Sequence, residues 1–192
     1  MKKTNLLNKT TLLNKITFFI IIYTIYVYIF RGYISYLPTI PIYPNNNKDL
    51  KLLKQQMNQR TNNDIELFFK TNDSVVHAFL PYVNETEENL NKIATSQNHI
   101  ILFFKYLINR RRPYQIDINL KPLSTLTSQT PAYPAGHAYQ ALLVASYLST
   151  KYPDKKKMFD NIAYECDKCR VKAGIHYISD GKFSKTLFHL FN

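Results

Sequence analysis

The most apolar stretch of the chain lies close to its N-terminus. Residues 16–30 read ITFFIIIYTIYVYIF and contain no charged residue, whereas four lysines precede them and Arg31 follows them. The hydrocarbon core of a bilayer, roughly 30 Å thick, requires about 20 residues of helix. That length is reached if the helix continues to Leu37 and the Arg31 guanidinium lies at the interface. We therefore expect a transmembrane anchor over residues 16–37, after a cytoplasmic basic tail over residues 1–15.

A cleaved signal peptide is the alternative to this anchor, because signal peptides have apolar regions of about 7–15 residues. The residues after Arg31 are bulky and offer no small-residue cleavage site, which favours the uncleaved anchor. Positive charge collects on the cytoplasmic side of membrane helices. The chain is therefore expected to be a single-pass membrane protein whose remaining domain lies on the lumenal or extracellular side.

The rest of the chain has helical periodicity and little of the alternation typical of strands. Residues 38–47 include the Pro- and Asn-rich sequence TIPIYPNNN and predict a linker. Leu50, Leu53 and Met57 then recur at helical spacing. We expect residues 48–192 to form one all-α helical bundle.

A capping-box pattern at Asn84 and Glu87 predicts the start of a second helix. An apolar stripe at helical spacing continues it: Leu90, Ile93, Ile101, Phe104 and Ile108. Pro113 is expected to end this helix. The sequence from Pro113 to Pro134 then predicts a long loop, of the kind that often carries function.

Two more helices are expected after the loop. Ala138–Leu148, AYQALLVASYL, is apolar on most faces and is typical of a central buried helix. Asp154 is a candidate N-cap for the next helix, along which Met158, Ile162 and Cys166 recur at helical spacing.

Composition restricts the classes of function. The chain has 192 residues, of which 45% are hydrophobic and 20% charged, which indicates one ordered domain with a core. Its 25 Lys+Arg against 13 Asp+Glu give a net charge of +12 and favour anionic partners. No nucleic-acid-binding motif accompanies this charge, so we expect no nucleic-acid partner. Cys166 and Cys169 form a lone CxxC pair without the further ligands of a zinc site, so we expect no metal.

Three blocks of residues carry candidate phosphate chemistry. The first is Lys105–Pro113, KYLINRRRP. Lys105 and Arg112 are seven residues apart, so on one helix they would project from the same face. An ammonium and a planar guanidinium suit a phosphate dianion. The alternative is a solvated basic helix terminus, and we assign Arg110 and Arg111 to that alternative.

The second block, Tyr133–His137, follows the long loop and opens the predicted buried helix. Free backbone N–H groups at a helix N-terminus bind anions, and Gly136 lets a ligand approach the backbone. His137 lies in the first turn. Taken alone, this histidine fits a structural role as well as a catalytic one.

The third block contains Arg170, His176 and Asp180. His176 and Asp180 are four residues apart and would face each other on one helical turn. A carboxylate beside an imidazole fixes the tautomer of the ring and stabilises its cation, which makes a better nucleophile or base. A surface His–Asp pair is the alternative.

Together the blocks resemble the tripartite signature of the type-2 phosphatidate phosphatase superfamily, which includes the class A acid phosphatases and the vanadium haloperoxidases. The signature, K-x6-R-P, P-S-G-H and S-R-x5-H-x3-D, corresponds to Lys105–Pro113, Pro134–His137 and Cys169–Asp180, with every internal spacing kept. Two serines of the signature are replaced here, by Ala135 and Cys169.

The resemblance implies a metal-independent phosphoric monoester hydrolase with an all-α bundle of the acid phosphatase/haloperoxidase type and no cofactor. In this interpretation His176 attacks phosphorus and forms a phosphohistidine, Asp180 orients its ring, and His137 protonates the leaving alcohol. The implied phosphate-binding residues are Lys105, Arg112, Gly136 and Arg170.

Several functions remain open at this level. The anchor favours a phosphate monoester carried on a lipid, such as phosphatidate, but a small soluble phosphomonoester fits the motif nearly as well. A vanadate-dependent haloperoxidase is the alternative within the superfamily. A catalytically weak or inactive membrane-anchored protein that binds anionic ligands is the alternative outside the enzymes, because Ala135 supplies no hydroxyl to the phosphate.

Overall fold

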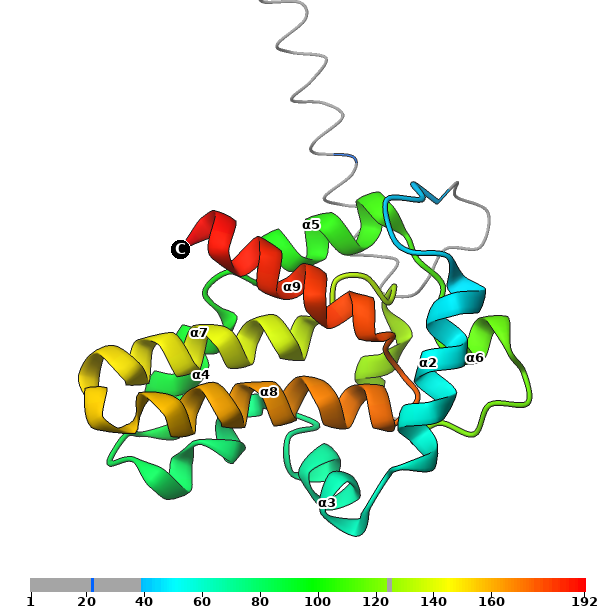
Figure 1. The fold of residues 1–192 in the computed structure, drawn as a ribbon. Coiled ribbons are helices and arrows are strands. Elements are labelled where there is room, and N and C mark those ends of the chain that lie inside the picture. The colour runs from blue at the N-terminus through cyan, green and yellow to red at the C-terminus, as the bar shows by residue number, and fades with distance from the viewer. Residues whose placement is uncertain (1–21, 23–38, 124–125) are drawn as a thin grey trace, which may run out of the picture. The chain divides into compact units, whose positions relative to one another are not determined.

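The described part of the chain is helical. A computed structural model describes residue 22, residues 39–123 and residues 126–192 (Figure 1). No strand occurs among those residues, which confirms the expected all-α class. The predicted basic tail and anchor, residues 1–37, lie outside the described residues apart from Ile22. Among the residues described, no helix combines the length and the apolar character needed to cross a membrane.

The described residues include eight α-helices, α2 to α9, and four short 3₁₀ helices. The α-helices are α2 (Asn46–Asn58), α3 (Asn62–Lys70), α4 (Glu87–Thr95), α5 (Asn98–Ile108), α6 (Pro113–Ile116), α7 (Gly136–Lys151), α8 (Lys156–Lys172) and α9 (Ile178–Phe191). The 3₁₀ helices are η1 (Val75–Ala78), η2 (Leu80–Tyr82), η3 (Leu126–Gln129) and η4 (Pro153–Lys155).

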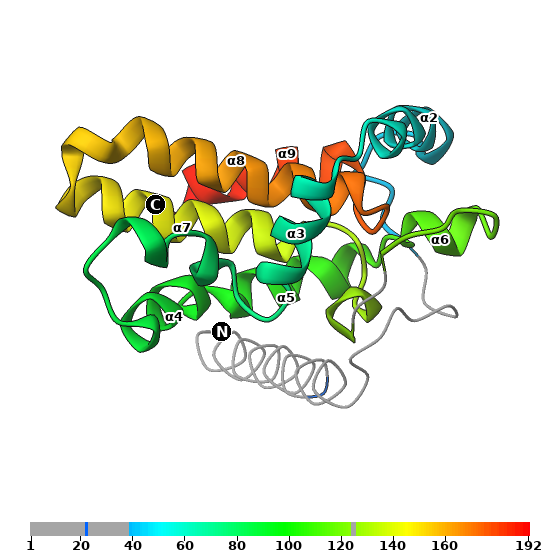
Figure 2. The same ribbon diagram turned by 90° about the horizontal axis from the view of Figure 1, so that it is seen from below.

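Helices α7 and α8 form the centre of the bundle and run side by side in opposite directions (Figures 1 and 2). Helix α7 contains the whole of the predicted buried segment, Ala138–Leu148, and most residues of that segment are buried, as expected. The main apolar core lies around Val144 and Leu148 of α7 and Phe159 of α8, which pack with Phe79 and with Leu90 of α4. Full burial of each such side chain stabilises the fold by roughly 1.5–3 kcal/mol.

The single helix predicted after Asn84 is wrong, because the chain forms two helices there. The cap of α4 is Thr86, whose hydroxyl accepts a hydrogen bond from the Asn89 N–H. Helix α4 ends at Thr95, and Gln97 leaves the helical conformation before α5 begins. The predicted apolar stripe is therefore divided between α4 and α5.

Helix α5 ends before Pro113 and for a different reason than the sequence suggests. Asn109 adopts the left-handed conformation, with φ 51°, which ends the helix; asparagine tolerates this conformation better than most residues. Pro113 instead occupies the first position of α6, where its missing N–H costs nothing.

Two other helix starts differ from expectation. Helix α2 begins at Asn46, inside the sequence assigned to the linker, because the Asn45 side chain accepts hydrogen bonds from the Asn47 and Lys48 N–H groups. Asp154 does not cap α8; it lies in η4, and α8 begins after Lys155 without a side-chain cap.

Candidate active site

The three motif blocks meet at one end of the α7–α8 pair. There the N-termini of α7 and α9 lie beside the C-terminal end of α8 and the turn that follows α5 (Figure 1). Most of the charged side chains gathered there are almost fully buried: Lys105, Arg110, Arg112, Arg170, His176 and Asp180.

His176 and Asp180 are in direct contact, with 2.9 Å between Nδ1 and Oδ2. The contact is not made across a helical turn, as predicted from the spacing. His176 precedes α9, Tyr177 is the N-cap residue of α9, and Asp180 is its third residue. The Asp180 carboxylate also accepts a hydrogen bond from the Tyr177 N–H, at 2.9 Å. The start of α9 therefore fixes the carboxylate against the imidazole.

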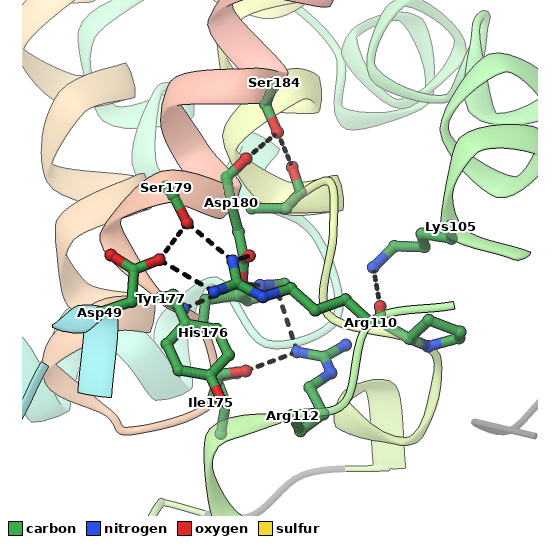
Figure 3. Close-up of polar contacts among 12 residues, drawn as sticks. Asp49, Lys105, Arg110, Arg112, Ile175, His176, Tyr177, Ser179, Asp180 and Ser184 are labelled. Atoms are coloured by element: carbon green, nitrogen blue, oxygen red, sulfur yellow. Dashed lines mark hydrogen bonds and ion pairs between the residues drawn. The ribbon is translucent and has the colours of Figure 1, made fainter. Parts of the chain in front are cut away.

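The hydrogen bonds of His176 assign its tautomer. Because the Asp180 carboxylate can only accept, Nδ1 carries the proton and Nε2 carries a lone pair. That lone pair faces Arg112, whose Nη1 lies 2.9 Å from Nε2 (Figure 3). The nucleophilic atom of a neutral imidazole is thus directed at a guanidinium.

Arg112 does not lie on α5, so the prediction that it shares a helix face with Lys105 is wrong. It lies in the turn after Asn109, with extended backbone. Hydrogen bonds to the carbonyls of Thr130, at 2.7 Å, and Ile175, at 2.8 Å, hold its guanidinium. Lys105 remains on α5 and donates to the Pro131 carbonyl at 2.6 Å (Figure 3).

The second block lies at the N-terminus of α7, as expected. The ring of His137 is held by a hydrogen bond between its Nε2 and the Asn72 carbonyl, at 3.1 Å. Gly136 is the first residue of α7, and a Cβ added there would lie 3.8 Å from Lys105 Cε and 3.7 Å from Ile101. Gly136 and Lys105 are therefore neighbours, although they are 31 positions apart in the numbering.

Arg170 reaches the site from α8. Its guanidinium donates to the Phe68 carbonyl at 3.1 Å and to the carbonyl and hydroxyl of Thr71 at 2.5 and 2.6 Å, and it lies over the Phe68 ring. Its Nε is buried and has no hydrogen-bond partner among the described residues. Arg170 therefore retains an N–H donor that the protein does not use.

Three of the buried cations lack a carboxylate partner. Among the described residues, no Asp or Glu lies within ion-pair distance of Lys105, Arg112 or Arg170. Burial accordingly lowers the pKa of Lys105 well below its usual value, with a further contribution from the nearby Arg112 charge, and lowers the pKa of Arg112 to about 10. Burial also lowers the pKa of Arg170.

These charges and the burial hold both histidines neutral at pH 7. Burial, followed by the charges of Arg112 and Lys105, lowers the pKa of His176 well below its ordinary value. Burial and the Arg170 charge lower the pKa of His137 to about 3. Burial raises the pKa of Asp180 to about 6, against the opposing effect of nearby cations, so Asp180 is mainly ionised at pH 7.

The environment of Arg110 differs most from what its sequence position suggests. We assigned it to a solvated helix end, but its side chain is fully buried. It forms ion pairs with Asp180, at 2.7 Å, and with Asp49 of α2, at 2.9 Å. One signal was available in the sequence: Asp49 lies four residues before Leu53, so it shares the buried face of that helix. Arg111 is exposed, as expected.

The two cysteines are buried and free. Burial raises the pKa of Cys166 to about 12 and that of Cys169 to about 11, so both remain thiols at pH 7. In residues 39–123 and 126–192, no three His, Cys, Asp or Glu side chains come together as a group that could hold a metal ion.

Comparison with known proteins identifies a solved structure with a similar fold. No family model matches the sequence, and no curated protein matches it. Among solved structures, the chain is similar to the first transmembrane PAP2 type phosphatidylglycerolphosphate phosphatase from Bacillus subtilis, with a TM-score of 0.51 and 21% sequence identity. The match covers 76% of this chain and 82% of that one. The shared fold confirms the resemblance drawn from the motif at the level of architecture.

Proposed function

We propose that this chain is a phosphoric monoester hydrolase that acts through a phosphohistidine formed on His176. One observation carries the proposal: three buried cations without carboxylate partners surround a neutral imidazole whose lone pair faces one of them. Burying a charge without a partner costs several kcal/mol. A phosphate dianion at this position would compensate the cations and would also place phosphorus beside His176 Nε2.

In the first step, the phosphoryl group is held by Lys105, Arg112, Arg170 and the backbone N–H groups at the start of α7. The Arg112 guanidinium exchanges its contact with Nε2 for contacts with phosphate oxygens. Nε2 then forms a bond to phosphorus while the ester P–O bond breaks. Asp180 stabilises the imidazolium that results, because it accepts the Nδ1 proton in a hydrogen bond.

His137 supplies the proton that the leaving alkoxide takes up. Its Nε2–H is held by the Asn72 carbonyl, so Nδ1 is the atom that gains and gives the proton. His137 is neutral in the protein alone, but a bound dianion favours the imidazolium and raises its pKa. In the second step neutral His137 accepts a proton from the water that attacks the phosphohistidine, which releases phosphate and returns His176 to its starting form.

Two observations support the class of substrate that we propose. The neighbour of known structure is, by its description, a transmembrane phosphatase of phosphatidylglycerolphosphate. The apolar segment at residues 16–30 favours a tether that holds the domain at a membrane surface. We therefore propose a lipid phosphate monoester as the substrate, with the domain on the lumenal or extracellular side.

The test uses the full chain purified in detergent. Phosphate release is measured from para-nitrophenyl phosphate and from phosphatidylglycerolphosphate in EDTA, beside His176→Ala. We expect turnover that EDTA leaves unchanged, that orthovanadate inhibits and that His176→Ala lacks. Full activity of folded His176→Ala would overturn the proposal.

A non-catalytic anion-binding protein is the second candidate, and Ala135 favours it. Ala135 precedes α7 and makes no side-chain cap, so the start of α7 offers the anion backbone donors and no hydroxyl. Loss of one hydrogen-bond donor of this kind costs on the order of 10²–10³-fold in rate. Phosphate binding without turnover, followed by turnover in Ala135→Ser, would identify the missing hydroxyl as the cause.

A further inference from the structure

We infer that Arg110 is a positioning residue, held by Asp49 and Asn46 of α2, that keeps Asp180 ionised and turned toward His176. The inference rests on the proposed function in one respect, namely that His176 is the nucleophile. It adds a residue at an unspecified position of the K-x6-R-P block and a helix, α2, whose start was assigned to the linker.

All five N–H groups of Arg110 already have acceptors within the protein. Nη1 donates to Asp180 Oδ1 and to Ser179 Oγ, both at 2.7 Å. Nη2 donates to Asp49 Oδ2 at 2.9 Å and to Asn46 Oδ1 at 3.0 Å, and Nε donates to the same Asn46 oxygen at 3.1 Å. A guanidinium has five N–H donors, so Arg110 keeps none for a substrate.

The other two arginines differ in this respect. The buried Nε–H of Arg170 is unpartnered, and the Nη2 of Arg112 makes a single hydrogen bond, to the Thr130 hydroxyl at 3.2 Å. Both can therefore bind an anion, whereas Arg110 can act only on its protein neighbours. Because Arg110 is buried and all of its donors have partners, we assign it a positioning role and not a role in phosphate binding.

The two oxygens of Asp180 divide their contacts between Arg110 and His176. Oδ1 accepts from Arg110, and Oδ2 accepts from His176 Nδ1 and the Tyr177 N–H (Figure 3). The faces of the Arg110 guanidinium are also confined, because the Tyr177 ring lies 3.9 Å and the Tyr43 ring 4.6 Å from its central carbon. Arg110 therefore fixes the plane of the carboxylate that meets the imidazole.

The charges around Asp180 explain why a cation is needed at this position. Asp180 faces Arg110, Lys105 and Arg112 from α5 and the turn after it, and His176 from its own segment. Negative charge comes from Asp49 of α2, which the Ser179 hydroxyl joins to the same cluster. Asp167 of α8 contributes in part, because burial and the Asp180 charge raise its pKa to about 7.

Removing the Arg110 cation would leave Asp180 facing this negative charge in a buried site. Arg110 opposes the effect of burial on the pKa of Asp180. An opposite charge at contact distance typically lowers a carboxyl pKa by about 1–3 units. Loss of Arg110 should therefore raise the pKa of Asp180 to neutral pH or above.

The experiment follows the Nδ1 proton of His176 by NMR of full chain labelled with ¹⁵N-histidine, because this signal does not depend on activity. His176→Gln assigns the signal by its loss. In the natural chain we expect the Nδ1 proton to be hydrogen-bonded at pH 7 and to change only below about pH 6. In Arg110→Gln the change should move up by about 1–3 pH units.

Two further variants separate charge from geometry. The double variant Asp49→Asn/Arg110→Gln loses one negative charge along with the positive one. Its His176 titration should therefore lie closer to that of the natural chain than the titration of Arg110→Gln does. Arg110→Lys keeps the cation but loses the planar fork, so the His176 titration should stay near that of the natural chain. Arg111→Gln, at the exposed neighbour, is the matched control and should leave the titration unchanged.

Kinetics provide the second measurement. We expect Arg110→Gln to lower kcat by about 10–100-fold, the range found when outer-shell partners of metal-binding histidines are removed, with little change in KM. An unchanged His176 titration in folded Arg110→Gln would overturn the inference, whether or not the chain hydrolyses phosphate esters. A shifted titration in a chain without hydrolysis would support the inference and count against the proposed function.

Discussion

The two ends of the α7–α8 pair are built on opposite principles. At one end Val144, Leu148 and Phe159 pack with other apolar side chains and have no exposed surface. The other end also buries cations and their polar partners, and three of these cations have no carboxylate within reach among the described residues. Burial stabilises the first end and is costly at the second.

This difference indicates where stability and function are located. The apolar end can support a charged end that would not be stable alone. A nearby ion pair makes the contrast clear: Lys172 of α8 contacts both carboxylate oxygens of Asp64, at 2.7 and 2.8 Å, so its charge is compensated. Arg170, two residues earlier, has no such partner. Among the described residues, the buried lysines and arginines that lack a carboxylate partner are therefore all motif residues.

Among substitutions that distinguish the two ends, His137→Ala at the charged end should have the largest effect, and this effect is on activity. Loss of the proton donor should lower kcat/KM for an alkyl phosphate by about 10²–10⁴-fold, the usual contribution of general acid catalysis. Para-nitrophenol is a much better leaving group and needs the proton less, so kcat/KM for its ester, which reports the steps up to release of the alcohol, should fall far less. Stopped assays on both esters measure the ratio. Equal losses on the two esters would contradict the assignment of His137 as the acid.

Phe159→Ala tests the apolar end. Phe159 is fully buried and packs with Phe79 and Tyr152, with ring centroids 6.3 and 6.4 Å away. The cavity should lower the free energy of unfolding by about 3–5 kcal/mol. Urea unfolding measures this loss. Activity per folded molecule should remain close to that of the natural chain, and a large loss of kcat in the folded variant would count against the separation of the two ends.

Lys105→Met should have opposite effects on stability and activity. Removing a buried cation without a carboxylate partner should raise the free energy of unfolding by about 1 kcal/mol, while phosphate binding and turnover fall. Thermal unfolding with and without inorganic phosphate provides the measurement. Phosphate should raise the Tm of the natural chain and have a smaller effect on the variant. A less stable variant would contradict the idea that Lys105 is held at a cost.

The smallest effect is the dependence of activity on pH. Because burial raises the pKa of Asp180 to about 6, protonation below that pH removes the charge that orients His176. We expect kcat/KM to fall as pH drops below about 6. Asp49→Asn leaves more of the Arg110 charge to act on Asp180 and should move this fall to lower pH. The substrate's own ionisation is the same for both proteins, so it cannot produce a difference between them.

Local patterns predicted much of the fold. The central helix α7 and the helical periodicity around Leu53 follow from apolar spacing alone, and the structure contains both. The start of α4 and the division between α4 and α5 could not be predicted in the same way. Thr86 and Asn84 are both acceptable caps, and tertiary packing selects between them.

The candidate site shows the same limit. The motif identifies Lys105, Arg112, His176 and Asp180 by type and spacing, and these residues lie together in the structure. The helical geometry assumed for each spacing is wrong, because Arg112 and His176 lie in turns. Arg110 could not be placed from spacing, because its partners come from segments more than 60 residues away, as its bond to Asp49 shows.

The central claim is that His176 carries the phosphoryl group, and trapping that intermediate tests it most directly. The full chain is mixed with para-nitrophenyl phosphate and quenched in alkali, which preserves phosphohistidine, and its peptides are analysed by mass spectrometry. The account predicts a phosphoryl group on His176 that is absent from His176→Ala and accumulates in His137→Ala, where the attacking water lacks its base. Turnover without any phosphorylated His176, or a phosphoryl group on another residue, would contradict the account.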